Sequence, residues 1–250
     1  MIAPAPKTST AGDVILARIR EALRIPAPLP HLKSHAAEAA VAPAAGSGLP
    51  ALTVLPAEVG RPWLPDGGET SAERVRILTE NLEKLRAVVL RVPDVAAAAA
   101  AIQGLVRERG WQRVAGHAHD LVEPVLTALP SAVHRVEAAA RFDKNALEAC
   151  DAGITACEAL VAQTGSILVS SRTCGGRALS ILPHVHVVVA TVDQIVATVG
   201  DALHLARDRH AGRMPSMLSF ITGPSRTGDI ERILVLGAHG PKELFVVLVG

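Results

Sequence analysis

Two glycine-rich loops carry arginines and hydroxyl groups that can bind an anion. The first spans residues 170–177 and the second spans residues 222–229, and each follows an apolar segment with the pattern of a strand. Glycine lets the backbone approach a ligand, consecutive N–H groups cradle an anion, and a guanidinium grips a carboxylate or phosphate through two parallel hydrogen bonds. Ligands of open α/β sheets lie beyond the carboxyl ends of the strands, so we expect both loops to converge on one cleft. The candidate anion-binding residues are Arg172, Gly175, Gly176, Arg177, Gly223, Ser225, Arg226 and Thr227.

The alternative for these loops is that they are ordinary tight turns whose arginines point into water. Gly-rich loops are weak motifs by themselves, and neither loop is a Walker loop or a GxGxxG fingerprint. The sequence therefore predicts neither a mononucleotide site nor a dinucleotide site. Three further residues are candidates for acid–base chemistry: Glu158, Asp229 and His239. Each also has a structural alternative, as a solvated helix face, a helix N-terminus and a turn histidine respectively.

Metal and redox chemistry find little support in the sequence. His117 and His119 form one HxH pair and His184 and His186 another, but neither pair has a third ligand at a suitable spacing, so we expect no metal site. The cysteines at positions 150, 157 and 174 fit neither a zinc site nor an iron–sulfur cluster. Cys174 lies between two arginines, where a lowered thiol pKa is conceivable.

Composition excludes several classes of protein. The 250 residues include 25 Lys+Arg against 24 Asp+Glu, without the basic excess that a phosphate-backbone binder needs. Aromatic residues make up 2%, too few for base-stacking platforms. No apolar run reaches the roughly 20 residues that span a bilayer, and no secretory signal is visible. We therefore expect a globular cytoplasmic protein that binds neither nucleic acid nor membrane.

The elements that position these residues alternate in a βα pattern. Residues 1–70 are expected to form an N-terminal helix and a Pro/Ala-rich extended arm, and residues 71–250 an α/β domain with a mostly parallel sheet and helices on both faces. Strands are predicted at 87–92, 113–116, 132–136, 153–155, 166–170, 185–191, 217–222, 233–236 and 244–249, and helices at 71–85, 94–109, 120–129, 143–149, 156–163 and from Asp193 to residue 206. The short segment 237–241 favours a hairpin-like return and one antiparallel edge.

Several stretches of the chain resemble the LUD-domain family, and within it the lactate-utilization C group. They are Gly153–Cys157 (GITAC), Gln163–Leu168 (QTGSIL), Gly176–Pro183 (GRALSILP) with His186, Gly223–Glu231 (GPSRTGDIE), Gly237–Pro241 (GAHGP) and Glu243–Leu248 (ELFVVL). The GPSRTGDIE stretch combined with GxHGP is specific. The resemblance covers residues 71–250 closely and the N-terminal arm loosely.

The resemblance implies a fold like that of the NagB/RpiA/CoA-transferase group. It also implies a role in oxidising L-lactate to pyruvate together with two partners, at least one of which carries iron–sulfur clusters. Since the sequence has no cluster-spaced cysteines and no nucleotide fingerprint, we expect no cofactor in this chain. The chain departs from the family at Gln163, where a Glu-Thr-Gly triplet is usual. A neutral amide cannot act as a base or form an acyl intermediate, which disfavours CoA-transferase chemistry and leaves Gln163 a hydrogen-bonding role.

Three functions are compatible with these observations. The first is a non-redox subunit of a lactate-oxidising system that binds a small anionic metabolite and has the capacity to form a homo-oligomer. The second is a stand-alone transferase or ligase acting on a phosphorylated or carboxylated metabolite, and the third is a small-molecule sensor. The lack of nucleotide fingerprints and cluster-spaced cysteines favours the first.

Overall fold

The computed structural model describes residues 18, 20, 21, 64–130, 132–135, 143–227, 235–237 and 240–250. Residues from Leu64 onward belong to one compact unit. Of the N-terminal helix expected near residues 15–23, only Arg18, Arg20 and Glu21 are described, and they are helical. The remainder of the predicted helix and most of the predicted arm lie outside the described residues.

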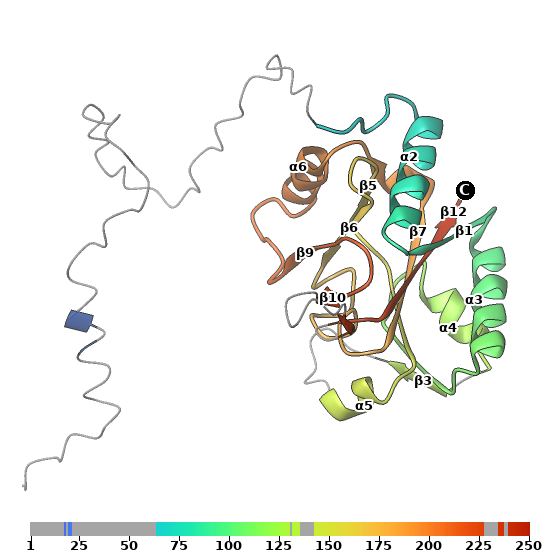
Figure 1. Ribbon diagram of the computed structural model, residues 1–250. Coiled ribbons are helices and arrows are strands. Elements are labelled where there is room, and N and C mark those ends of the chain that lie inside the picture. The colour runs from blue at the N-terminus through green and yellow to red at the C-terminus, as the bar shows by residue number, and fades with distance from the viewer. Residues whose placement is uncertain are drawn as a thin grey trace, which may run out of the picture. The chain divides into compact units, whose positions relative to one another are not determined.

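A parallel sheet of six strands lies at the centre of the fold (Figure 1). Its order is β1-β12-β7-β4-β2-β3, and every neighbouring pair is parallel. The strands are β1 Val88–Val92, β2 Arg113–Gly116, β3 Ala132–Arg135, β4 Ala152–Thr155, β7 Val185–Thr191 and β12 Glu243–Val249. The apolar runs of β7 and β12 are buried along almost their whole length, as strands covered on both faces require. The predicted α/β class with a mostly parallel sheet is confirmed.

A second sheet packs against one face of the first. It contains β5 Ala159–Val161, β6 Ser166–Ser170, β8 Ile195–Val196 and β9 Leu218–Ile221 in the order β8-β5-β6-β9. β6 is antiparallel to both β5 and β9. Leu160, Ile167 and Val169 of this sheet are buried against Val188 and Val246 of the central one. A short antiparallel ladder joins β10 Arg226–Thr227 to β11 Val235–Leu236.

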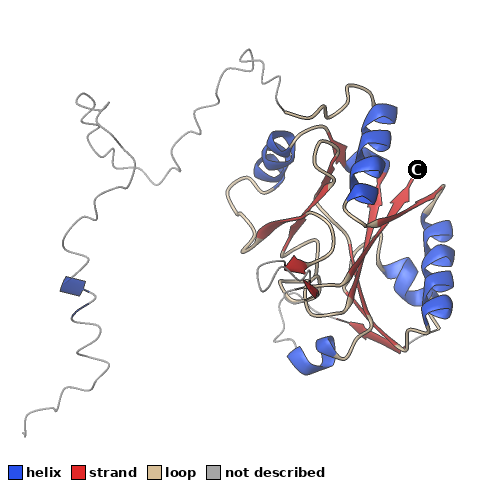
Figure 2. Cartoon of the chain, in the orientation of Figure 1, coloured by secondary structure: helices blue, strands red, loops and turns tan. Residues whose placement is uncertain are grey.

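Helices complete the layers on both sides (Figure 2). They are α2 Ser71–Lys84, α3 Val95–Arg109, α4 Glu123–Ala128, α5 Lys144–Glu148, α6 Val199–Arg209 and the 3₁₀ turn η1 Val192–Gln194. α3 and α4 cover one face of the central sheet, α2 shares the opposite face with the second sheet, and α6 packs on the outer side of that second sheet. Among the described residues, no helix is both long and apolar enough to cross a membrane.

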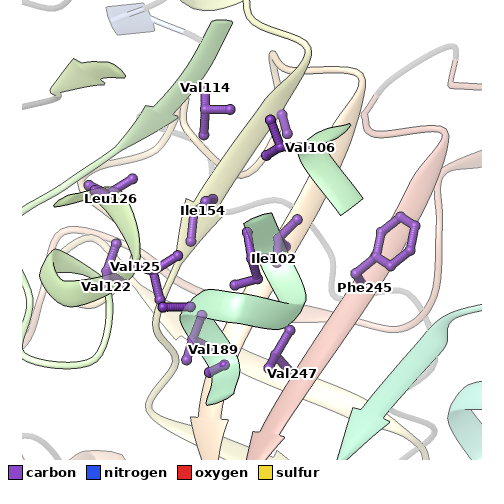
Figure 3. Packing of buried hydrophobic residues seen from close by; sticks show 14 of the residues in the cluster. Ile102, Val106, Val114, Val122, Val125, Leu126, Ile154, Val189, Phe245 and Val247 are labelled. Atoms are coloured by element: carbon purple, nitrogen blue, oxygen red, sulfur yellow. The ribbon is translucent and has the colours of Figure 1, made fainter. Parts of the chain in front are cut away.

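The helix α3 shows how the sequence sets these boundaries. The Asp94 side chain caps its first turn by accepting a hydrogen bond from the backbone N–H of Ala97, and Gly110 ends it in the left-handed conformation. The alanines let the helix lie close to the sheet, where Ile102 and Val106 reach the strands (Figure 3). Phe245 of β12 and Val125 of α4 belong to the same apolar cluster.

Three expected elements differ from the structure. Residues 156–163 do not form a helix: they contain β5, because tertiary packing between two layers overrides their helical propensity. Asp193 lies in η1, and the helix α6 starts later, where Thr198 and Asp201 form a capping box. The C-terminal strand is not an antiparallel edge, since β12 lies parallel between β1 and β7.

Candidate functional site

A carboxylate with no exposed surface lies in the segment between β4 and β5. Glu158 accepts three short side-chain hydrogen bonds: from Ser170 Oγ at 2.6 Å, from Arg209 Nη1 at 2.6 Å and from His210 Nε2 at 2.9 Å. Charged side chains are almost never fully buried unless they are paired, and both Glu158 oxygens are paired here. The sequence singled out Glu158 as a candidate, although it expected the residue on a helix.

The environment keeps Glu158 ionised. Burial acts to raise the pKa of this carboxyl, but the hydrogen bonds from Ser170, His210 and Arg209 outweigh burial and hold the pKa below its usual value. The attraction of His210 acts in the same direction. A negative charge therefore persists beside His210 at neutral pH.

The contacts of His210 fix which ring nitrogen carries the proton. Because the ionised Glu158 can only accept, Nε2 of His210 must donate the hydrogen bond between them. Nδ1 of His210 lies 3.3 Å from Nη1 of Arg172, and a guanidinium can only donate, so Nδ1 acts as the acceptor. These two contacts use Nε2 of His210 as a donor and Nδ1 as an acceptor, so the carboxylate sets both the orientation and the tautomer of the ring.

A pocket of about 440 Å³ lies in front of this pair. It is lined by Arg172, Arg209, His210, Ala211 and Arg213. Nη2 of Arg172 donates to the carbonyl oxygen of Arg213 at 2.9 Å, while the Arg213 guanidinium has no hydrogen-bond or ion-pair partner among the described residues. Three guanidinium groups thus stand against one carboxylate, an excess of positive charge that suits an anion.

Local structure explains how the two sides of the pocket are held. On one side, β6 ends at Ser170, whose hydroxyl accepts hydrogen bonds from the backbone N–H groups of Arg172 and Thr173 and so fixes the turn. On the other side, α6 ends with His210 as its C-cap, and basic residues in the last helical turn are stabilised by the helix dipole.

The second predicted loop lies elsewhere. Gly223, Ser225 and Arg226 line a separate pocket of about 370 Å³, whose other lining residues are Ser180, Ile181, Met217, Ser219, Phe220, Ile221, Thr222, Gly240 and Pro241. The guanidinium of Arg226 donates to the carbonyl oxygen of Leu85 at the C-terminus of α2. The backbone N–H of Ser225 donates to the carbonyl oxygen of Pro241 at 2.9 Å.

The expectation that both loops meet in one cleft is therefore wrong. It assumed parallel neighbours, whose carboxyl ends share an edge, but β6 and β9 are antiparallel, with Ser170 opposite Leu218 and Ile167 opposite Ile221. The loop after β6 and the loop after β9 consequently leave the second sheet at opposite ends.

The other sequence candidates have structural contacts or lie outside the described residues. Arg177 donates from Nη2 to the carbonyl oxygen of Ser216 at 2.6 Å, and Gln163 from Nε2 to the carbonyl oxygen of Pro65 at 2.7 Å. Gly175 and Gly176 both have positive φ angles in the turn beside Arg177. Thr227 lies in the backbone ladder of β10, whereas Asp229 and His239 lie outside the described residues.

The buried histidines and cysteines are not poised for ligand binding. Burial lowers the pKa of His186, and burial followed by the repulsion of His119 lowers that of His117, to about 4 in both cases. Cys174 is buried, and burial raises its thiol pKa to about 11, so the lowered pKa considered from its neighbouring arginines is wrong. In the part of the chain that the structure describes, no group of three or more His, Cys, Asp or Glu side chains could hold a metal ion.

Sequence reasoning missed Arg209, His210 and Arg213. Their signal is the concentration of three basic side chains within five positions at the end of the stripe of apolar residues in α6. This cluster of basic residues becomes informative only when the fold shows that Arg209 and His210 contact Glu158, about 50 residues earlier in the chain.

The structure combines a mixed α/β fold with a buried carboxylate–histidine pair beside an arginine-lined pocket, and its family follows from sequence comparison. The LUD domain model matches residues 75–249, so the chain belongs to the LUD domain family. A crystal structure of a DUF162 family protein from Deinococcus radiodurans superposes with a TM-score of 0.56 at 27% identity, covering 73% of this chain and 100% of that one.

Curated relatives share a common name. Lactate utilization protein C of Deinococcus radiodurans is 40% identical over 106 residues, which cover 42% of this chain and 49% of the relative. Lactate utilization protein C of Bacillus subtilis is 35% identical over 104 residues, covering 41% of this chain and 43% of the relative. The aligned part thus spans about half the length of the curated relatives that it matches.

Proposed function

We propose that this protein is a component of a lactate-utilization system in the cytoplasm that supports the oxidation of L-lactate to pyruvate together with iron–sulfur partner proteins. The observation that carries the proposal is the LUD domain match over residues 75–249, together with relatives named lactate utilization protein C. The chain itself handles no electrons in this scheme. Its own contribution is to bind a small anion.

The arginine-lined pocket supports this contribution. Lactate and pyruvate each carry one carboxylate, and Arg172, Arg209 and Arg213 present guanidinium groups at one opening. Arg209 is already engaged by Glu158, whereas Arg213 has no described partner, so we assign the first carboxylate contact to Arg213. The pocket replaces the single cleft that the sequence predicted from both loops.

The need for a redox partner follows from the chemistry. Oxidation of lactate to pyruvate removes two electrons, which an acceptor must take up. The sequence contains neither a dinucleotide fingerprint nor cysteines spaced for a cluster. Burial also raises the pKa of the Cys157 thiol to about 12, so this cysteine stays protonated, and the thiolate is the form that binds metal. We therefore assign the electrons to the iron–sulfur partners.

The test is a reconstitution with L-lactate and an artificial electron acceptor. The purified chain should show no turnover alone, and activity should appear when the iron–sulfur partner proteins are added. Arg213→Ala should reduce that activity, while Arg207→Ala, which removes an exposed arginine of the neighbouring helix that pairs with Asp208, should not. Steady turnover by the isolated chain, or a stoichiometric flavin or cluster in it, would overturn the proposal.

A further inference from the structure

The pocket beside α6 is connected to the place where an open α/β sheet binds its ligands. The neighbouring parallel strands β2 and β4 send the chain to opposite faces of the central sheet: β2 leads to α4 on one face, and β4 leads to the second sheet on the other. Ligands of such sheets bind outside the carboxyl ends of two strands that diverge in this way. Glu158 follows β4 at this point and holds Arg209 and His210, which line the pocket.

The positive charges of the pocket are only partly balanced by the protein. Arg172, Arg209 and Arg213 line it, and the Glu158 carboxylate neutralises one of them, Arg209. In the part of the chain that the structure describes, neither Arg172 nor Arg213 forms an ion pair. Two guanidinium charges therefore remain for a ligand. A carboxylate balances one of them, whereas a phosphate monoester carries about two negative charges near pH 8 and balances both.

The hydrogen-bond donors of the pocket are in excess as well. Arg209 uses Nη1 on Glu158, at 2.6 Å from Oε2 and 3.2 Å from the backbone oxygen, so its Nε and Nη2 have no partner among the described residues. Arg172 uses Nη1 on the ring of His210 and Nη2 on the carbonyl oxygen of Arg213. One guanidinium fork fills the single edge that a carboxylate presents. The three terminal oxygens of a phosphate monoester can accept from all three guanidinium groups.

The size of the pocket fits a ligand larger than a free phosphate ion. Its volume of about 440 Å³ lies within the range of roughly 300–1,000 Å³ that is typical of sites for small organic molecules. A monoester fills such a space with its organic part while its phosphate contacts the arginines. Inorganic phosphate shares the charge and the oxygens but leaves the remaining volume to water.

We propose that this pocket binds the phosphate monoester of a small molecule in its dianionic form. Arg213 and the free donors of Arg209 receive the terminal oxygens, and Arg172 contributes its Nε atom. The inference rests on the anion binding described under the proposed function and adds a second class of ligand to the same site. Because both ligands use the same arginines, a bound monoester excludes lactate and so regulates the site by competition.

The experiment compares matched phosphate esters by calorimetry on the full-length chain at pH 8. Methyl phosphate is a dianion at this pH, and dimethyl phosphate carries the same tetrahedral group with a single charge. We expect methyl phosphate to bind about tenfold more tightly, because its second charge meets a guanidinium that has no carboxylate partner. The preference should shrink as salt is added, since the arginines are open to solvent. Glycerol 3-phosphate should bind more tightly than inorganic phosphate.

Two matched variants place the dianion in the pocket. Arg213→Gln removes an exposed side chain without an ion-pair partner among the described residues, so it should fold normally and reduce the preference for methyl phosphate to about threefold or less. Arg207→Gln removes an exposed arginine of α6 that pairs with Asp208, and it should leave the preference unchanged. An unchanged preference in the Arg213 variant would overturn the inference.

The remaining outcomes separate this inference from the proposed function. Equal binding of methyl and dimethyl phosphate would overturn the inference, and L-lactate binding in the same preparation would leave the anion-binding proposal standing. Inorganic phosphate that binds more tightly than both monoesters would also overturn it, in favour of a free phosphate ion. Preferred binding of methyl phosphate by a chain that does not bind L-lactate would support the inference and contradict the assignment of lactate to this pocket. Binding of none of these anions would overturn both proposals.

Discussion

Glu158 shows how one residue carries both stability and chemistry. The protein surrounds its carboxylate with three donors from two elements: Ser170 from the end of β6, and the neighbours Arg209 and His210 from the end of α6. Removing one partner of such a buried set leaves the others unsatisfied, which costs more than the pair itself contributes. The same set holds the tautomer of His210, so the stabilising contacts also orient the ring that lines the pocket.

Glu158→Gln should lower the free energy of unfolding at pH 7 by about 2–4 kcal/mol, because a neutral amide leaves the Arg209 charge without its partner. The folded-state pKa of Glu158 is depressed, so its contribution is fully present above the unfolded-state value near 4.5 and is lost as the pH falls through the folded-state pKa. Urea titrations at several pH values should therefore show the variant and the wild type converging in acid.

The exposed pair of Lys144 and Glu148 supplies a matched control. Both side chains are solvated, at 67% and 47% exposure, and Glu148→Gln should change stability by less than about 0.5 kcal/mol. A loss as large as that of the Glu158 variant, or a Glu158 variant as stable as the wild type at pH 7, would contradict this account.

Residue types alone could identify Glu158 and Arg172 but not their partners. Glu158 was a candidate for acid–base chemistry and Arg172 for anion binding. Arg172 lines the pocket, and Glu158 bonds to His210, which also lines it. The role of His210 depends on the fold, which brings the C-terminal end of α6 against a segment about 50 residues away. The spacing of these residues along the chain does not predict that contact.

Arg213→Ala should weaken anion binding, whereas Arg226→Ala should not. Arg213 faces the pocket without a described partner, and Arg226 is held by the carbonyl oxygen of Leu85, where its loss affects the end of α2. We expect the Arg226 variant to lose about 1 kcal/mol of stability, the typical contribution of one hydrogen bond. Calorimetry with L-lactate and a thermal unfolding curve distinguish the two effects, and the reverse pattern would move the site to the second loop.

At the scale of elements, predictions succeeded where local signals and packing agree. The boundaries of α3 follow from Asp94 and Gly110, and the apolar runs of β7 and β12 are those of buried parallel strands. The prediction of a helix at 156–163 was wrong. Alanine, leucine and glutamine favour a helix there, but packing between the two layers favours the strand β5. Burial between layers is a property of the whole fold, and a short window of sequence does not contain it.

The central strand β4 requires a glycine at position 153, because the packing there leaves no room for a side chain. A Cβ atom added at Gly153 would lie 2.5 Å from the carbonyl oxygen of Leu179, a backbone atom that cannot move aside cheaply. Gly153→Ala should therefore destabilise the protein by about 1–3 kcal/mol, the usual cost of overpacking. Circular dichroism melts of the purified variants measure the effect.

Gly104 in α3 is the matched control for that substitution. An added Cβ there meets nothing within 4 Å, and alanine is the better helix former, so Gly104→Ala should raise stability by about 0.5–1 kcal/mol. If both substitutions shift the melting temperature in the same direction, the close approach of β4 to Leu179 is not what constrains position 153.

At the scale of the whole molecule, close packing buries two histidine side chains, His117 and His186. His186 of β7 faces the second sheet and bonds to Thr155 Oγ1 at 2.8 Å, and His117 follows β2. Both are buried, and the Nδ1 atom of His186 and the Nε2 atom of His117 have no hydrogen-bond partner among the described residues. Each ring is tolerated because it stays neutral.

Because these two histidines are buried, we predict that the protein loses stability in mild acid. Burial lowers the pKa of each histidine from about 6.5 to about 4, so the unfolded chain takes up protons that the folded protein refuses. Stability is therefore fully present above pH 6.5 and declines as the pH falls toward 4. Each histidine contributes a loss of roughly 2–3 kcal/mol between pH 7 and pH 4.5. Glu158 adds its own loss at lower pH.

The measurement is a series of urea unfolding curves between pH 7.5 and pH 4.5, with two variants beside the wild type. His186→Gln removes one titrating group and keeps an amide that can bond to Thr155, so its stability should depend less steeply on pH than that of the wild type. His204→Gln changes an exposed histidine and should leave the slope unaltered. Equal slopes in the wild type and the His186 variant would mean that the His186 ring accepts its proton without unfolding, and that the layers open locally in acid rather than excluding the charge.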